Sequence, residues 1–221
     1  MTGASPPAGV GIVGSGDIGA TVAALCVANG IEVALSNSRG PQSLAPLVER
    51  LGPLARAASV EEAAGFGDLV LLAIPFFAHA ELAPGLFDGR VVVDACNWFP
   101  GRDGPTPELV SGQLVSTEWL GRHFAGARMV KALHNLNFAV LANEADRGLP
   151  NDRRVAVLVA ADDAGAKALA SAWLDALGLG VLDVGPLHDG GLRASPGSPL
   201  FNNPMTVADA SSIHTTMLES R

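Results

Sequence analysis

A glycine-rich turn directly after a short apolar run is the feature that most constrains the fold of this chain. Residues 9–13 read GVGIV, a continuous apolar run typical of a buried parallel strand. Gly14, Gly16 and Gly19 follow at once in the pattern GxGxxG, and the alanine- and valine-rich segment 17–29 is predicted to be a helix. In this strand–turn–helix context the glycine pattern predicts a dinucleotide site.

Each glycine has its own physical role in that prediction. The first permits a tight turn, the second lets the backbone approach a pyrophosphate, and the third lets the helix pack closely on the strand. The backbone N–H groups expected to face the anion at the N-terminus of the helix belong to Ser15, Asp17 and Ile18. The alternative interpretation is a tight turn that holds no ligand.

Strand-like and helix-like segments alternate along the rest of the chain. Strands are predicted at 32–35, 54–57, 69–74, 91–94, 129–133, 155–160 and 181–184. Helices are predicted at 41–51, 60–64, 78–86, 118–124 and 162–177, with a long loop at 97–111 and a weakly periodic tail at 192–221. The alternation predicts a doubly wound, mostly parallel α/β sheet covered by helices on both faces.

The same reading divides the chain into three parts. We predict a disordered N-terminus over residues 1–8, a dinucleotide-binding domain over 9–150, and a small C-terminal α/β extension with a tail over 151–221.

Composition excludes several classes of function. The chain is 48% apolar and 16% charged, against about 25% charged in an average chain, so it is expected to form a packed core. A net charge of −8 argues against nucleic-acid and anionic-membrane partners. No leader pattern is visible, and the apolar run 69–78 is too short to span a bilayer, which predicts a cytoplasmic protein. Cys26 and Cys96 lie apart in apolar contexts and predict no metal site.

The end of the second predicted strand indicates which dinucleotide is bound. NAD sites place an Asp or Glu there to accept from the ribose 2′-OH, whereas this strand ends in Ser36, Asn37, Ser38 and Arg39. A guanidinium and neighbouring hydroxyls match a 2′-phosphate well. NADP(H) is therefore predicted over NAD, unless Arg39 is only a solvated turn residue.

Later strand ends should meet at the same edge of the sheet. Ile74, Pro75 and Phe76 end one strand and could pack on the nicotinamide, while Asn97 could bind ribose or carboxamide, or simply form a turn.

The sixth strand leads into a polar cluster at the same edge. Lys131, followed by Ala132, could offset phosphate charge or extend from a strand edge, and His134 could contact the second substrate, donate a proton, or be structural.

Taken in order, the segments GIVGSGDIG, ALSNSRGP, LLAIPF, VKALHNL, AADDAGAKAL and LDVGPL resemble the family of NADPH-dependent reductases of the deazaflavin coenzyme F420. The resemblance runs from about residue 10 to residue 187 and is strongest to the bacterial branch. It implies a Rossmann-type domain with a small C-terminal extension, Ser38 and Arg39 at the 2′-phosphate, and Ile74 and Pro75 near the nicotinamide. It also places residues 133–136 near the deazaflavin, although Asn135 stands where the family has Thr.

The resemblance implies direct hydride transfer between two stacked rings, with F420 or a flavin as the co-substrate and no obligatory acid–base residue. Archaeal-type members end in an apolar helix, whereas residues 195–204 here are rich in Ser, Pro and Asn, which leaves the second substrate open. The alternatives are a reductase of a small carbonyl or imine, with His134 or Lys131 as proton donor, and a non-catalytic NADP-binding redox sensor. A homodimer is expected only because it is the commonest oligomer.

Overall fold

An eight-stranded sheet in the order β3-β2-β1-β4-β5-β6-β7-β8 runs through the whole molecule. The structure is a computed structural model that describes residues 4–220. Neighbouring strands are parallel except β6 and β7, which are antiparallel with Lys131 opposite Ala160. The prediction of a Rossmann-type, doubly wound and mostly parallel sheet is confirmed.

The strands are β1 (Gly9–Val13), β2 (Glu32–Ser36), β3 (Ala55–Ala57), β4 (Leu69–Leu72), β5 (Val91–Asp94), β6 (Arg128–Lys131), β7 (Ala156–Ala160) and β8 (Gly180–Gly185). The longer helices are α1 (Asp17–Ala28), α2 (Ala45–Leu51), α6 (Ser116–His123), α7 (Phe138–Glu144), α8 (Ala164–Ala176), α9 (Leu187–Ala194) and α10 (Val207–Glu219). Short helical segments are η1 (Pro41–Leu44), α3 (Val60–Ala64), η2 (Phe76–Glu81), α4 (Pro100–Asp103), α5 (Pro107–Val110) and η3 (Asn151–Arg153).

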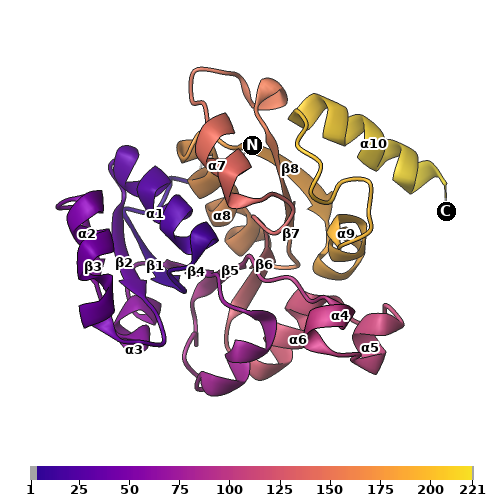
Figure 1. Cartoon of the computed structure of the whole chain (residues 1–221). Helices are drawn as coiled ribbons and strands as arrows, with labels where there is room; N and C mark the ends of the chain where they lie inside the picture. Colours follow the sequence, from indigo (N-terminus) through magenta and orange to yellow (C-terminus); the bar gives the residue numbers. More distant parts are fainter. Residues whose placement is uncertain (1–3, 221) are drawn as a thin grey trace.

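Helices cover both faces of the sheet (Figure 1). Apolar side chains of α1, α7 and α8 pack on one face, and those of α3, α6 and the segment after β4 pack on the other. The fully buried Trp173 of α8 anchors the first layer, and Phe76, Phe87 and Phe124 anchor the second. A third cluster lies between the C-terminal strands and α10.

The order of the strands determines where a ligand can bind. From β1 the chain moves outward to β2 and β3, then crosses back to place β4 on the other side of β1. This reversal creates a crevice outside the carboxyl ends of β1 and β4, the place where ligands of such sheets bind. The turns that follow β1, β2, β4, β5 and β6 therefore form the candidate site.

Several predicted elements differ from the structure. The helix predicted at 78–86 is the short 3₁₀ segment η2, and the loop predicted at 97–111 contains α4 and α5. The weakly periodic tail contains the last three residues of α9 and all of α10. In α10 the inward positions Val207, Ala210, Ile213 and Met217 recur every three or four residues, but the intervening Ser and Thr residues mask this helical period in the sequence.

The structure bears on the predicted disordered N-terminus and on the predicted C-terminal extension. Residues 1–3 of the predicted disordered N-terminus lie outside the described residues, while Pro7 is buried and the Ala8 carbonyl accepts from the Glu32 N–H. Beyond residue 150, β7 and β8 continue the same sheet, and a separate C-terminal unit stays a prediction. None of the helices in residues 4–220 is long and apolar enough to cross a membrane.

Candidate functional site

The turn between β1 and α1 is built on contacts between main-chain atoms. Gly14 has a φ of +110°, and a Cβ there would collide with the carbonyl oxygen of Ala73 at the end of β4. A Cβ on Gly19 would collide in the same way with the carbonyl oxygen of Gly14. A Cβ on Gly16, in contrast, would meet nothing within 4 Å. Two glycines are therefore needed for packing, and the third leaves open space above the helix.

That open space lies at the positive end of a helix dipole. Gly16 is the N-cap of α1, and no side chain of the described residues caps the first turn. Its N–H groups are therefore free of side-chain partners and can bind an anion. The exposed side chain of Asp17 lies in this first turn, so the predicted contributions of Ser15, Asp17 and Ile18 are those of their backbone amides. The turn fits a dinucleotide pyrophosphate.

Asn37 organises the turn that follows β2. Its Nδ2 donates to the hydroxyl of Ser15 in the glycine turn at 3.2 Å and to Ser43 at 3.0 Å. Its Oδ1 accepts from the backbone N–H of Arg39 at 2.9 Å. One amide thus connects the glycine turn to the segment where a 2′-phosphate is predicted.

The side chains of this segment differ in accessibility. Ser38 and Arg39 are exposed, and Arg39 is the only charged residue between Glu32 and Glu49. Ser36 is fully buried, and its hydroxyl donates to the Ile12 carbonyl at 3.2 Å. The prediction that Ser36 donates to a phosphate is corrected, because this hydroxyl is already used inside the sheet.

The residues after β4 divide between the site and the core. Ile74 lies beside the glycine turn, with its Cγ2 3.0 Å from where a Cβ of Gly14 would be, and Pro75 is exposed. Phe76 is fully buried and packs edge-on against Phe77, with ring centroids 5.1 Å apart. Phe76 therefore belongs to the core layer, which corrects its predicted contact with the nicotinamide.

A buried ion pair joins the ends of β5 and β6. The Nζ of Lys131 lies 3.2 Å from Oδ2 of Asp94, and the two side chains are 3% and 0% exposed. Lys131 also donates to the Cys96 carbonyl and to the Ser116 hydroxyl, while Asp94 accepts from the Cys96 N–H and the Thr117 hydroxyl. All the described contacts of this ammonium group are internal. The predicted role of Lys131 near cofactor phosphates is corrected to a structural one.

Two neighbours of this pair share its burial. Burial raises the pKa of the Cys96 thiol well above its usual value, and the charge of Asp94 adds to this, so Cys96 is an unreactive thiol. Ala132 is also fully buried, and its N–H donates to the Asp94 carbonyl. Because Ala132 is fully buried, it cannot contact a cofactor directly in this structure.

His134 is also tied into the structure. It is 3% exposed, and its Nε2 donates to the carbonyl of Ala194, the last residue of α9, at 3.1 Å. Burial lowers the pKa of this imidazole well below its usual value, and the charge of Lys131 lowers it further. His134 is therefore a neutral, buried ring in this structure, and its role as a catalytic residue stays a prediction.

The backbone around His134 is fixed as firmly as its side chain. Leu133 has a φ of +61°, which is strained for a residue other than glycine. Asn97, predicted at the ribose or carboxamide, donates its Nδ2 to the His134 carbonyl at 2.8 Å and so supports this turn. The Asn135 side chain accepts from the Leu158 N–H and donates to the Ala156 carbonyl.

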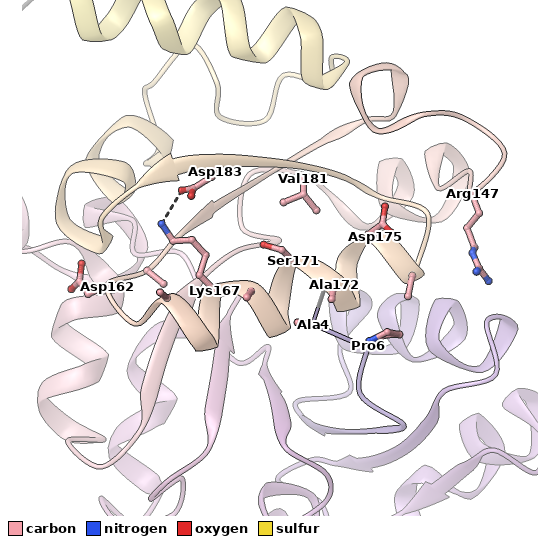
Figure 2. Close-up of a pocket in the computed structure, with 14 residues that line it drawn as sticks. Ala4, Pro6, Arg147, Asp162, Lys167, Ser171, Ala172, Asp175, Val181 and Asp183 are labelled. Atoms are coloured by element: carbon pink, nitrogen blue, oxygen red, sulfur yellow. Dashed lines mark hydrogen bonds and ion pairs between the residues drawn. The ribbon is translucent and has the colours of Figure 1, made fainter. Parts of the chain in front are cut away.

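Two of the hollows on the described surface are well formed. The larger, about 820 Å³, lies between α8, β8 and residues near the N-terminus (Figure 2), and none of the predicted site residues lines it. Its Lys167 is paired with Asp183 at 2.8 Å. The smaller, about 200 Å³, lies beside the β5 and β6 ends and is lined by Trp98, Pro100, Leu109, Leu114, Val115, Ser116, Leu192, Ser195 and Pro196.

Ser116 was not among the site residues predicted from the sequence. Nothing in the local pattern around Ser116 distinguishes it from a serine that begins a helix. Its hydrogen bond with Lys131 is visible only in the structure.

The fold and the glycine turn define a dinucleotide-binding α/β protein of the Rossmann class. Residues 9–98 match the family described as NADP oxidoreductase, coenzyme F420-dependent. The match lies in the N-terminal region and includes the glycine turn, so this part of the chain is similar to that family of NADP-dependent oxidoreductases.

Other relatives extend the likeness to the rest of the chain. It is 31% identical over 182 residues to metalloreductase STEAP3 of Rattus norvegicus, which covers 80% of this chain but only 34% of that protein. This chain therefore spans about a third of that relative's length.

Solved structures agree on the fold. A hypothetical protein, SMa0349, of Sinorhizobium meliloti is 29% identical, with a TM-score of 0.79, covering 92% of this chain and 96% of that one. A candidate F420-dependent NADP-reductase of Arthrobacter sp. FB24 is 23% identical, with a TM-score of 0.66, covering 89% and 98% of the two chains. A reductive aminase of Aspergillus terreus bound to NADPH is 18% identical, with a TM-score of 0.60, covering 97% and 64%.

Replacing Gly16 by Val should separate cofactor binding from folding. The new side chain enters open space at a φ of −71°, so the melting temperature should change by less than about 3 °C. The same side chain occupies the approach to the helix N-terminus, so NADPH affinity should fall at least about tenfold. Calorimetric titration with thermal unfolding tests both points. Undiminished NADPH binding in the variant would remove the pyrophosphate from this turn.

The buried imidazole of His134 predicts a specific acid sensitivity. Its pKa is below the ordinary 6.5 in the folded protein, so the unfolded chain binds the proton more readily. The stability from this neutral ring is fully present above about pH 6.5 and falls as the pH falls. Between pH 7 and 5 the wild type should lose up to about 2 kcal/mol more free energy of unfolding than His134→Gln. Denaturant unfolding measures this difference, and parallel pH profiles would contradict it.

Proposed function

We propose that this protein is an NADP(H)-dependent oxidoreductase that transfers a hydride between NADPH and a deazaflavin, coenzyme F420, or a flavin-like ring. The observation that carries the proposal is the glycine turn, in which Gly14 and Gly19 are packed against main chain while Gly16 stays open at the start of α1. The family match over residues 9–98 supports the same cofactor and the same kind of acceptor.

The segment after β2 supports NADP over NAD. The Asn37 amide lies where an NAD enzyme would have an acid, and Ser38 and Arg39 lie exposed beside it. A neutral amide does not repel a 2′-phosphate, and a guanidinium attracts it. The N–H groups of the glycine turn would hold the pyrophosphate, while Ile74 and Pro75 would border the nicotinamide.

The state of the two predicted proton donors, His134 and Lys131, favours a ring acceptor over a small carbonyl or imine. Reduction of a carbonyl or imine needs a proton donor near the nicotinamide. His134 is neutral and bound to the Ala194 carbonyl, and Lys131 is held by Asp94, Cys96 and Ser116. Bound NADPH supplies the hydride, and the chain's own residues orient the rings and exclude water.

Asn37→Asp should weaken the preference for NADPH over NADH. The substitution keeps the shape and the acceptor for the Arg39 N–H but adds a negative charge where the 2′-phosphate is proposed. The Kd for NADPH should rise about tenfold or more, equivalent to ~1.4 kcal/mol, while that for NADH stays within about threefold. Fluorescence titration of both cofactors measures this. Gln42→Glu adds the same charge at an exposed position nearby and should have a smaller effect, and equal losses for both cofactors would contradict the assignment.

The acceptor is identified by following NADPH oxidation without oxygen. The panel contains F420, FMN, FAD, a quinone, a small ketone, an imine and a ferric chelate, the last because one relative is named a metalloreductase. The highest kcat/KM is expected with F420 or a flavin. NADPH binding without oxidation by any acceptor would instead support a redox sensor, and preference for the ketone or imine would overturn the ring acceptor.

A further inference from the structure

The smaller hollow has a distinctive chemical lining. Apolar side chains form its wall, contributed by the segment after β5, the region before α6, and the end of α9. Its polar side-chain groups are the indole N–H of Trp98, which donates to the Gly104 carbonyl at 3.2 Å, and the hydroxyls of Ser116 and Ser195. The hydroxyl of Ser195 donates to the Gly191 carbonyl at 2.7 Å, so its hydrogen is used within the protein.

The hydroxyl of Ser116 differs from that of Ser195 in its hydrogen bonding. Its oxygen accepts from the Lys131 Nζ at 3.2 Å, so its own hydrogen points elsewhere. Among the bonds formed within residues 4–220, none uses that hydrogen. An ammonium group that donates to a hydroxyl strengthens the hydroxyl as a donor in turn. Ser116 therefore offers a polarised O–H in a mainly apolar hollow.

The side chains around the hollow carry no net charge that would attract an ion. The charge of Lys131 behind Ser116 is balanced by Asp94 at 3.2 Å, and no charged side chain is among the lining residues. A suitable occupant is therefore neutral and apolar, with one acceptor atom at its edge. A cavity of roughly 150 Å³ can hold benzene, so about 200 Å³ accommodates one six-membered ring with a small substituent.

We propose that this hollow binds a flat six-membered ring bearing a carbonyl oxygen, and that Ser116 donates its hydrogen bond to that oxygen. Lys131 is the positioning residue, because it fixes and polarises the Ser116 hydroxyl from behind. The proposal rests on the proposed function in one respect: it takes the ring to be part of the redox acceptor. Such a ring is found in single-ring ketones and at one end of a flavin or deazaflavin.

The first experiment measures binding without turnover. Acetophenone and ethylbenzene have similar shapes, and only the ketone can accept a hydrogen bond. Each is titrated while the indole N–H resonance of Trp98, identified with Trp98→Phe, is followed by NMR. The wild type should bind acetophenone several-fold more tightly than ethylbenzene. Equal affinities, or no shift of the Trp98 resonance with either compound, would overturn the proposal.

Variants then test the named residues. Ser116→Ala should remove the preference for the ketone, lowering its affinity about three- to tenfold, with ethylbenzene binding unchanged. The matched control is Ser111→Ala, which removes an exposed hydroxyl bonded to the Glu108 carbonyl and should change neither affinity. A ketone preference that survives in a folded Ser116→Ala protein would overturn the assignment.

The positioning role of Lys131 needs a variant that keeps its surroundings neutral. The double variant Lys131→Gln and Asp94→Asn removes both charges together and keeps hydrogen-bonding groups in place. It should reduce the preference for the ketone while ethylbenzene still binds. If this variant fails to fold, Ser116→Ala still decides the role of the hydroxyl, and an unchanged preference in the folded double variant would refute the role of Lys131.

A final comparison identifies the source of the ring. Lumiflavin carries amide-type ring carbonyls at one end of its three-ring system, so a shift of the Trp98 resonance by lumiflavin supports the end of a flavin-like acceptor. A shift by acetophenone alone supports a single-ring ketone. With a working acceptor, Ser116→Ala should raise the KM for that acceptor at least fivefold without altering the Kd for NADPH. Wild-type enzyme that oxidises no NADPH would refute the proposed function and leave the binding results valid.

Discussion

Close packing of main chain on main chain at the β1–α1 turn underlies the rest of this structure. Gly19 lets α1 approach the carbonyl of Gly14, and Gly14 in turn lies against the carbonyl of Ala73. These contacts bring the start of the helix to the crevice between β1 and β4 and leave its amides open. A methyl group at either position would move the helix away from the strands, and the anion site would lose both its shape and its place.

The other side of the crevice is organised by charge. Asp94 and Lys131 end neighbouring strands and satisfy each other in the interior, where an unpaired charge would be strongly destabilising. Their remaining hydrogen bonds reach the backbone after β5 and the start of α6. The pair therefore determines where the segment after β5 goes, and with it the position of Ser116 in the smaller hollow.

The general architecture could be predicted because strand–turn–helix signals are local. The β1–α1 unit and β5 lie where the sequence pattern indicates. The direction of single side chains could not be predicted at the strand ends, since a continuous apolar run has no alternation to show which side faces the core. The inward direction of Ser36 and Phe76 was not predicted for this reason. The burial of Lys131 and His134 depends on Asp94 and Ala194, partners that are 37 and 60 residues away.

The smaller hollow is assembled from both ends of the chain. Its Trp98 and Ser116 come from the segments around β5 and α6, whereas Leu192, Ser195 and Pro196 arrive only after β8. The main-chain contacts of the glycine turn reach no further along the chain than Ala73, just after β4. During synthesis, the residues that make these contacts therefore leave the ribosome well before those that complete the smaller hollow.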